Sequence, residues 1–327
     1  MNIKVLDGKH INNNYLKSQI KSSPMKDKKL NVGGQAVIEG VMIRGPKKYV
    51  VAVRKKGKIL EKKGNIPTKQ NKFLKFPFVR GFVNLVDMLI IGIKSLMWSA
   101  EQATGEKEKL TRKEITLTLF ISLAFVILFM IALPYFLTHL FGLAEENEPI
   151  LFNLVDGLIR IAIFVIYIFA ISFMKDVKIL FQYHGAEHKA IHCYEHGKKL
   201  NSENVKKFTT LHPRCGTSFL ILVLVVSILV FSILPSVIMM YYPAFADLSV
   251  WLRRGILFPV RILLIPVIAG ISYEILKLSD RKQANILFRM ISAPGLLLQK
   301  ITTQEPNQKQ IEVAIHSLKK LIKIEKK

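Results

Sequence analysis

The sequence is poor in cysteine and in acidic residues. Of its 327 residues only two are cysteines, and 23 acidic residues stand against 48 basic ones, which gives a net charge of +25. Two cysteines cannot form the disulfide framework of a small secreted domain, so a reducing compartment is expected. The first apolar run comes late, after a lysine-rich start without a small-residue cleavage site, so no signal peptide is expected.

Motifs for nucleotides and nucleic acids are also missing. The chain has no Walker-type glycine loop, no dinucleotide fingerprint and no repeat of alternating aromatic and basic residues. A basic chain can bind nucleic acid, but here the basic residues flank apolar segments. This arrangement favours a membrane surface with anionic headgroups. We therefore expect the lipid bilayer as a partner and no nucleic acid.

Long apolar runs are abundant, since half of all residues are apolar. Four runs supply about 20 mostly apolar residues each, enough to cross a hydrocarbon core of about 30 Å: residues 115–137, 151–173, 218–240 and 256–273. In the second run Asp156 and Arg160 are four residues apart and can pair on a helix. The fourth run is the weakest, because it carries Arg261 and two prolines. Residues 76–100 also have a helical period, but their charges favour an amphipathic helix at the membrane interface.

The charges of the loops indicate an orientation. Regions 1–114, 174–217 and the tail after Tyr273 are basic, whereas the loop from His139 to Pro149 has three glutamates and no lysine or arginine. The positive-inside rule then places both termini and the 174–217 loop in the cytoplasm. We expect a multi-pass protein of a bacterial cytoplasmic membrane, with no visible internal repeat.

Together these features predict a mainly α-helical membrane protein with about four transmembrane helices and a small N-terminal antiparallel β unit. The expected segments are a disordered basic tail (1–31), the β unit (32–75), an interfacial amphipathic helix (76–114), transmembrane helices one and two (115–173), a cytoplasmic His-rich helical loop (174–217), transmembrane helices three and four (218–273), and a cytoplasmic tail with an amphipathic helix from Gln308 (274–327).

The 174–217 loop holds the candidate chemistry. It contains five of the eight histidines and both cysteines, in the order His184, His188, His192, Cys193, His196, His212, Cys215. On a helix, two histidines four residues apart lie on one face and can bind one metal ion. His184, His188, His192 and His196 cannot all bind the same ion, because each step of four residues drifts by about 40° around the helix. The His-x-x-Glu-His pattern is that of an inverted zincin, in which the glutamate is the general base.

A catalytic zinc usually takes a third protein ligand and keeps one position open. His212 and Cys215 are the main candidates for this ligand, and Glu195 and Glu274 are weaker ones. Cys193 is expected to be a packed thiol. Cys215 could instead belong to a helix start capped by Thr217 or Ser218, and the histidines could simply face water or headgroups. Soft thiolate and imidazole ligands favour zinc or iron.

Three stretches carry a resemblance to a known family. They are Gly33–Met42, Tyr183–Lys189 and His212–Phe219, with further likeness at Glu203–Val205 and Thr303–Pro306. At these motifs the chain resembles the YqhQ-like bacterial membrane proteins, a family of unknown function that is described as predicted metal-dependent enzymes. The resemblance covers nearly everything after about residue 30. It implies a bacterial membrane location and a metal, and it implies no substrate.

Two functions of different class remain open. The first is a metal-dependent hydrolase in which His184 and His188 hold the ion, His212 or Cys215 completes its shell, and Glu187 activates water. Glu39 and Arg44 could enter this site from the β unit, Arg44 to orient an anionic or carbonyl substrate. The second is an adaptor or regulatory protein in which a closed shell of His184, His188, His212 and Cys215 holds a structural metal. A transporter is less expected, because the spans are few and carry only Asp156, Arg160 and Arg261 as ionisable groups.

Overall fold

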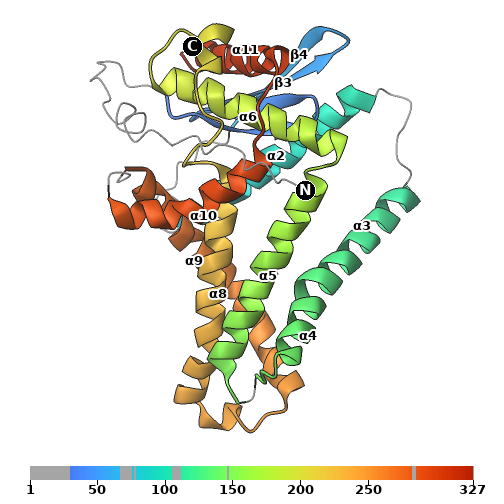
Figure 1. Ribbon diagram of the computed structural model, residues 1–327, viewed down its shortest axis with the longest axis vertical. Coiled ribbons are helices and arrows are strands. Elements are labelled where there is room, and N and C mark those ends of the chain that lie inside the picture. Colours follow the sequence, from blue (N-terminus) through green and yellow to red (C-terminus); the bar gives the residue numbers. More distant parts are fainter. Residues whose placement is uncertain are drawn as a thin grey trace, which may run out of the picture.

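Figure 1 shows the computed structural model, in which residues 30–66, 76, 79–104, 112–145, 147–281 and 285–326 are described. The chain is mainly helical and has a small N-terminal sheet, as expected. The tail expected over 1–31 lies outside the described residues, except for its last two positions.

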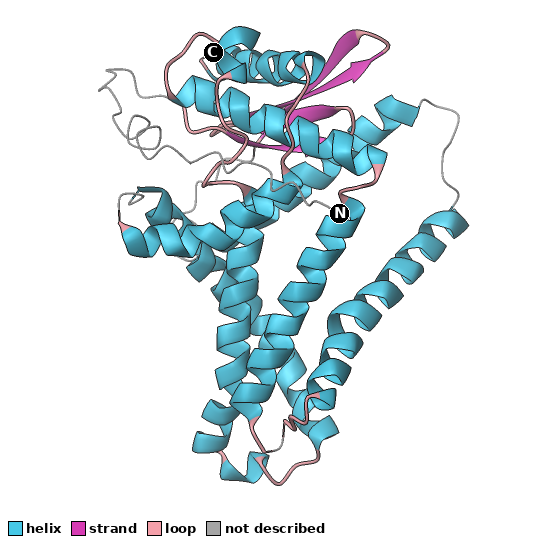
Figure 2. Cartoon of the chain, in the orientation of Figure 1, coloured by secondary structure: helices cyan, strands magenta, loops and turns pink. Residues whose placement is uncertain are grey.

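The N-terminal unit is a four-stranded antiparallel meander (Figure 2). Its strands are β1 (Gly33–Val37), β2 (Gly40–Arg44), β3 (Lys48–Lys55) and β4 (Lys58–Asn65). The turn between β1 and β2 contains Glu39, whose φ of 54° lies in the left-handed region. Glu39 is therefore a turn residue of the β unit.

Helices cover both faces of the sheet. Successive side chains of a strand point to opposite faces, so Val41 and Ile43 of β2 pack against α6 (Lys175–Glu195) and α11 (Gln308–Glu325). Met42, between them, packs on the other face with Ile91 of α2 (Val79–Thr104). The amphipathic helix expected from Gln308 is confirmed as α11, whose apolar side is buried on the sheet.

The long helices form a bundle below this unit (Figure 1). They are α3 (Arg112–Ile127) continued by the π-helix η2 (Leu128–Ala132) and α4 (Leu133–Leu140), then α5 (Pro149–Ile171), α8 (Gly216–Tyr241) and α9 (Val250–Arg281). The π-helical turn comes just before Pro134, which has no N–H for the usual helical hydrogen bond. Asp156 and Arg160 of α5 form the expected ion pair at 2.7 Å.

Among the described residues, five helical segments are long and apolar enough to cross a membrane: Val79–Ala103, Thr116–Leu140, Pro149–Ile171, Gly216–Tyr241 and Leu252–Ser279. The four expected spans are among them, and the fifth lies in α2. The sheet, α6 and α11 gather at one end of the bundle, and the loops after Leu140 and Tyr241 lie at the other end (Figure 1). The N-terminal unit, the His-rich helix and the C-terminal helix therefore share one end of the molecule.

Two shorter helices, α7 (Ser202–Lys206) and α10 (Ile286–Thr302), complete the second half of the chain. α7 follows α6, and α10 packs on α8 and α9. α10 runs through Pro294-Gly295, although such a pair is usually a turn signal in a sequence. Gly295 is required there, since a Cβ at this position would lie 2.6 Å from the Cα of Ser218. The glycine lets α10 approach the start of α8, where the candidate site is found.

Candidate metal centre

Two histidines of α6 form the centre of the site. As their spacing predicts, His184 and His188 lie on one face of the helix, with ring centroids 4.5 Å apart. This face meets the chain that follows α10: at Gly185, a Cβ would overlap the backbone oxygen of Gln304. The close contact fixes α6 against the 302–306 segment and so orients both rings.

Cys215 is the third member of the group. Its Sγ lies 3.2 Å from Nε2 of His184, and one donor atom from each of His184, His188 and Cys215 lies within 4.8 Å of the others. The residue is the N-cap of α8 and accepts a hydrogen bond from the backbone N–H of Thr217 at 3.4 Å. The alternative in which Thr217 or Ser218 caps this helix is therefore wrong, because the helix already begins at Gly216.

Backbone carbonyls determine which imidazole nitrogen of each ring is free. Nδ1 of His184 donates to the carbonyl of Thr302 at 2.9 Å, and Nδ1 of His188 donates to the carbonyl of Thr210. A carbonyl can only accept, so both protons must be on Nδ1, and both Nε2 lone pairs are left for an ion. Hydrogen bonds of this kind are the usual support of metal-binding histidines.

The protonation states also suit a cation. Burial lowers the pKa of His188 to about 4, so this imidazole is neutral. The backbone N–H of Thr217 donates to Sγ of Cys215 at 3.4 Å, and this hydrogen bond favours the thiolate form that binds a metal. In a tetrahedral zinc site the nitrogen and sulfur ligands are about 3.6 Å apart, and the 3.2 Å between His184 and Cys215 needs only a small adjustment. The three residues therefore fit a zinc-type ion.

A buried acid lies beside the three candidate ligands. Glu187 is 2% exposed, and its Oε2 lies 3.4 Å from Nε2 of His188. Burial raises the pKa of Glu187 to about 8. The carboxylate reaches this place because residue 34 is glycine: a Cβ there would lie 2.9 Å from Glu187 Oε1.

Comparison with known proteins gives the family. The model described as "Protein of unknown function (DUF1385)" matches residues 76–324. "Uncharacterized protein YqhQ" from Bacillus subtilis (strain 168) is 36% identical over 313 residues, which cover 90% of this chain and 92% of the relative. The chain belongs to the DUF1385 family. No solved structure matches it.

A second group lies one turn further along α6 in this DUF1385 protein. His192, Glu195 and His212 also bring donor atoms within 4.8 Å of one another. His212 Nδ1 accepts from the backbone N–H of Arg214 at 3.2 Å, so its Nε2 carries the proton and donates to Glu195 at 3.2 Å. Arg214 also pairs with the other oxygen of Glu195. Both ring nitrogens of His212 thus belong to a hydrogen-bond network, whereas in the first group Nε2 of His184 faces Cys215 and Nε2 of His188 faces Glu187.

The other histidines and Cys193 complete this end of α6. The ring of His212 is 5.6 Å from that of His188, and His212 as a fourth ligand stays a prediction. Burial lowers the pKa of His192 to about 3. Its Nε2 donates to Leu211, and its Nδ1 has no hydrogen-bond partner among the described residues. Cys193 is a buried free thiol in the core, as expected.

The residues expected from the β unit lie apart from each other. Glu39 accepts a hydrogen bond at 3.4 Å from Tyr183, one helical turn before Glu187. Arg44 is on the same face of β2 as Met42, toward α2, whereas Glu187 approaches the other face of the sheet. Burial lowers the pKa of Arg44, and nearby Asp87 and Tyr273 oppose this shift. A direct role of Glu39 or Arg44 in the DUF1385 site stays a prediction.

Sequence analysis missed three contributors to the site. The carbonyls of Thr210 and Thr302 orient the imidazoles, and Gly34 makes room for the carboxylate. Backbone carbonyls leave no signal in a sequence, because any residue supplies one. Gly34 belongs to the stretch Gly33–Met42 that carries the family resemblance, but a sequence does not show which distant side chain a glycine makes room for. Glu274, a weaker ligand candidate, binds Arg80 on α2.

Proposed function

We propose that this protein is a metal-dependent hydrolase embedded in the cytoplasmic membrane of a bacterium, with its site at the cytoplasmic face. The observation that carries the proposal is the group of His184, His188 and Cys215 beside the buried carboxylate of Glu187. Three protein ligands and a neighbouring acid are the pattern of a catalytic site, since the fourth position is left for substrate or water. The basic loops of the ligand-bearing end support its cytoplasmic side.

The residues would divide the work as follows. A zinc-type ion at the three ligands supplies Lewis-acid chemistry, which polarises a carbonyl or phosphoryl oxygen or a water molecule. Burial raises the pKa of Glu187, but a cation held by the neighbouring ligands would lower it again. The carboxylate would then accept the proton from the attacking water and return it to the leaving group. Its burial keeps bulk water from competing for that proton. His184 is the more exposed of the two histidines, so water and substrate would enter from its side.

A structural metal is the second candidate, and one observation favours it. The sheet with α6 and α11 forms a polar unit at one end of the bundle. The ligands come from α6 in this polar unit and from the start of α8 in the bundle, so an ion would join the two parts. A structural site needs a closed shell of four protein ligands, and His212 would be the fourth. An adaptor or regulatory membrane protein would then need no Glu187.

Metal content and coordination test the proposal. We expect about one equivalent of zinc or a related ion in the detergent-purified protein by elemental analysis. X-ray absorption of the bound metal should show four ligand atoms: one sulfur, two nitrogens and one light atom from water. Because His212 is not expected to be a ligand, His212→Ala should keep all four, as should the control His316→Ala. Cys215→Ser and His188→Ala should lose most of the metal.

Activity separates the two candidates. Chromogenic carboxylic and phosphate esters serve as probes, because the natural substrate is not required for slow turnover by such a site. Glu187→Gln should keep the metal and lower turnover by a factor of about 100 or more, as expected for removal of a general base. The hydrolase proposal fails if the protein binds no stoichiometric metal, or if the coordination is a closed shell of three nitrogens and one sulfur.

A further inference from the structure

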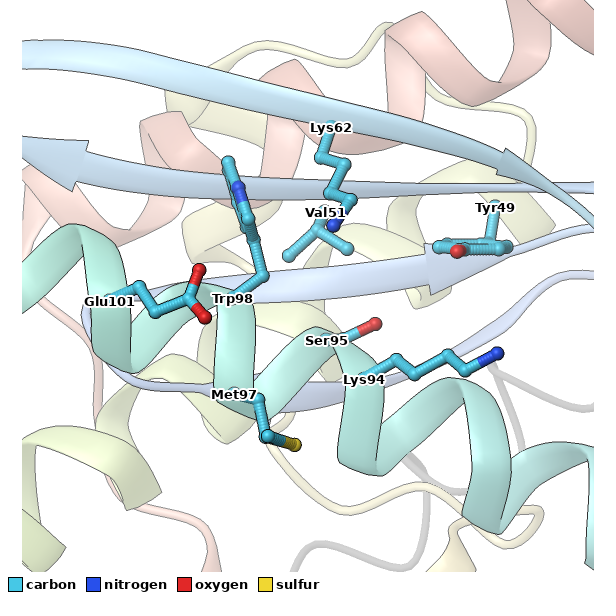
Figure 3. Close-up of a pocket in the computed structure, with 8 residues that line it drawn as sticks. All are labelled: Tyr49, Val51, Lys62, Lys94, Ser95, Met97, Trp98 and Glu101. Carbon is cyan, nitrogen blue, oxygen red and sulfur yellow. The ribbon is translucent and has the colours of Figure 1, made fainter. Parts of the chain in front are cut away.

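A pocket lies between α2 and the sheet, on the face opposite to the metal centre. Its volume is about 230 Å³, and its lining includes Tyr49, Lys62, Lys94, Trp98 and Glu101 (Figure 3). Lys62 comes from β4, Tyr49 from β3, and the other three from α2, where Lys94 and Glu101 are exposed and Trp98 is half-buried against the core. None of these residues takes part in the site proposed for hydrolysis.

The pocket has unsatisfied positive charge. Neither Lys62 nor Lys94 makes an ion pair or a hydrogen bond within the part of the chain that the structure describes, and Lys62 only lies over the ring of Trp98 at 5.8 Å. The single acid, Glu101, is seven residues from Lys94 on α2, which is about 10 Å along the helix axis. Figure 3 shows Glu101 at the opposite end of the pocket from Lys94. Two ammonium groups are therefore available to an anion.

An exposed apolar surface of α2 adjoins the pocket. Its side chains are between 41% and 61% exposed: Leu89, Ile90, Ile93, Leu96 and Met97. At 100° per residue they fall within an arc of about 120° on the helix. Lys94 lies at one edge of this arc, where a lysine can follow an apolar surface with its stem and keep its ammonium in the headgroup region.

The contact between α2 and α9 gives the depth at which α2 begins. Arg80, near the start of α2, binds Glu274 of α9 at 2.6 Å. The candidate span on α9 begins at Leu252, and 22 residues at 1.5 Å each put Glu274 about 33 Å further along. This length matches a hydrocarbon core of about 30 Å, so α2 starts where α9 leaves the core. Trp98 and Tyr49 of the pocket belong to the two residue types that gather at a membrane interface.

We propose that this pocket binds the phosphate headgroup of an anionic phospholipid, whose acyl chains lie on the apolar arc of α2. Lys62 and Lys94 contact the phosphate, and Trp98 forms the wall between headgroup and chains. A soluble phosphate could meet the same two lysines, but it would leave the apolar arc uncovered. The lipid satisfies both surfaces at once.

Trp98 itself can report the occupant, because the chain has only one other tryptophan, Trp251. The full-length Trp251→Phe protein is placed in phosphatidylcholine bilayers with a small fraction of brominated phosphatidylglycerol or, separately, of brominated phosphatidylcholine. Bromine quenches an indole only at short range. We expect stronger quenching by the anionic lipid. Each lysine should raise the affinity for the anionic lipid relative to phosphatidylcholine about fivefold.

Charge-matched variants complete the test. Lys62→Gln/Lys94→Gln should reduce the preference to about one, whereas Lys319→Gln/Lys323→Gln, on exposed positions of α11 across the sheet, should keep it. Equal quenching by both lipids in the unmodified pocket overturns the proposal, and so does full preference in the first variant. Loss of the preference on adding millimolar inorganic phosphate at constant ionic strength would identify a soluble anion as the occupant and would also overturn it. Metal content stays unchanged in both variants, so this result is independent of the hydrolase proposal.

Discussion

At the scale of single residues, the position of Glu187 depends on a missing side chain. The carboxylate lies against β1 where Gly34 has no Cβ, and a methyl group there would lie 2.9 Å from Oε1 and 2.5 Å from the backbone oxygen of Met42. Neither the strand nor the buried α6 can easily move, because both belong to one packed core. Gly34 is thus a positioning residue for the acid.

Gly34→Ala should therefore move the carboxylate and leave the three ligands in place. We expect a loss of about 1–3 kcal/mol in unfolding free energy from overpacking. The metal should stay bound at the wild-type stoichiometry, while ester hydrolysis falls. Gly33→Ala is the matched control, since a Cβ at position 33 has nothing within 4 Å. If both variants have the same activity, Gly34 does not position Glu187.

At the scale of elements, an ionic cluster joins β4 to α11. Glu61 accepts hydrogen bonds from Lys320 at 2.6 Å, His316 at 2.9 Å and its strand neighbour Lys63 at 3.2 Å. Burial alone would raise the pKa of Glu61, but these three hydrogen bonds outweigh it and lower the pKa to about 2. The carboxylate is partly exposed to solvent, which screens the interaction, so it is worth about 1 kcal/mol.

The sign of the resulting pH dependence follows from linkage. The folded pKa lies below the unfolded value of about 4.3, so the cluster stabilises fully above that value and is lost as the pH falls toward 2. The protection factors of the β4 amides, which correct the exchange rate for its intrinsic pH dependence, should therefore fall between about pH 4.5 and 2. Glu61→Gln should remove this fall in protection, and the exposed Glu203→Gln on α7 should keep it. An identical pH profile in Glu61→Gln and the parent protein would contradict the assignment.

At the scale of the whole molecule, the candidate metal centre lies at the junction between the polar unit and the bundle. The junction also has a neutral link: Gln299 of α10 accepts from the backbone N–H of His212 at 2.8 Å and donates to Ser218 of α8 at 2.7 Å. This amide is fully buried. The junction should therefore survive without metal, although in a weaker form.

Removal of the metal should lower the stability of the protein as a whole. An ion present at 100 times its dissociation constant stabilises the folded state by about 2.7 kcal/mol, which corresponds to a decrease of roughly 5–10 °C in Tm on chelation. Thermal unfolding of the detergent-purified protein with and without EDTA measures this. Cys215→Ser should start at the lower Tm and respond little to EDTA. An equal response of the two proteins would place the stabilising ion elsewhere.

The sequence by itself determined the features that depend on local geometry. The lengths of the apolar runs, the strands around Lys56-Gly57, the apolar side of α11 and the shared face of His184 and His188 all follow from a fixed period and rise per residue. The pairing of Asp156 with Arg160 was predictable for the same reason. A periodic pattern identifies these elements whatever their neighbours are.

Only the tertiary structure decided how the site is assembled. It brought Cys215, rather than His212, into one group with the two histidines, and it turned Arg44 toward α2. It also extended a helix through Pro294, so that the carbonyl of Thr302 reaches a histidine 118 residues away. These outcomes depend on packing between distant segments, and the sequence records the side chains of those segments without their distances. The tautomer that frees Nε2 for a metal is set by such a contact.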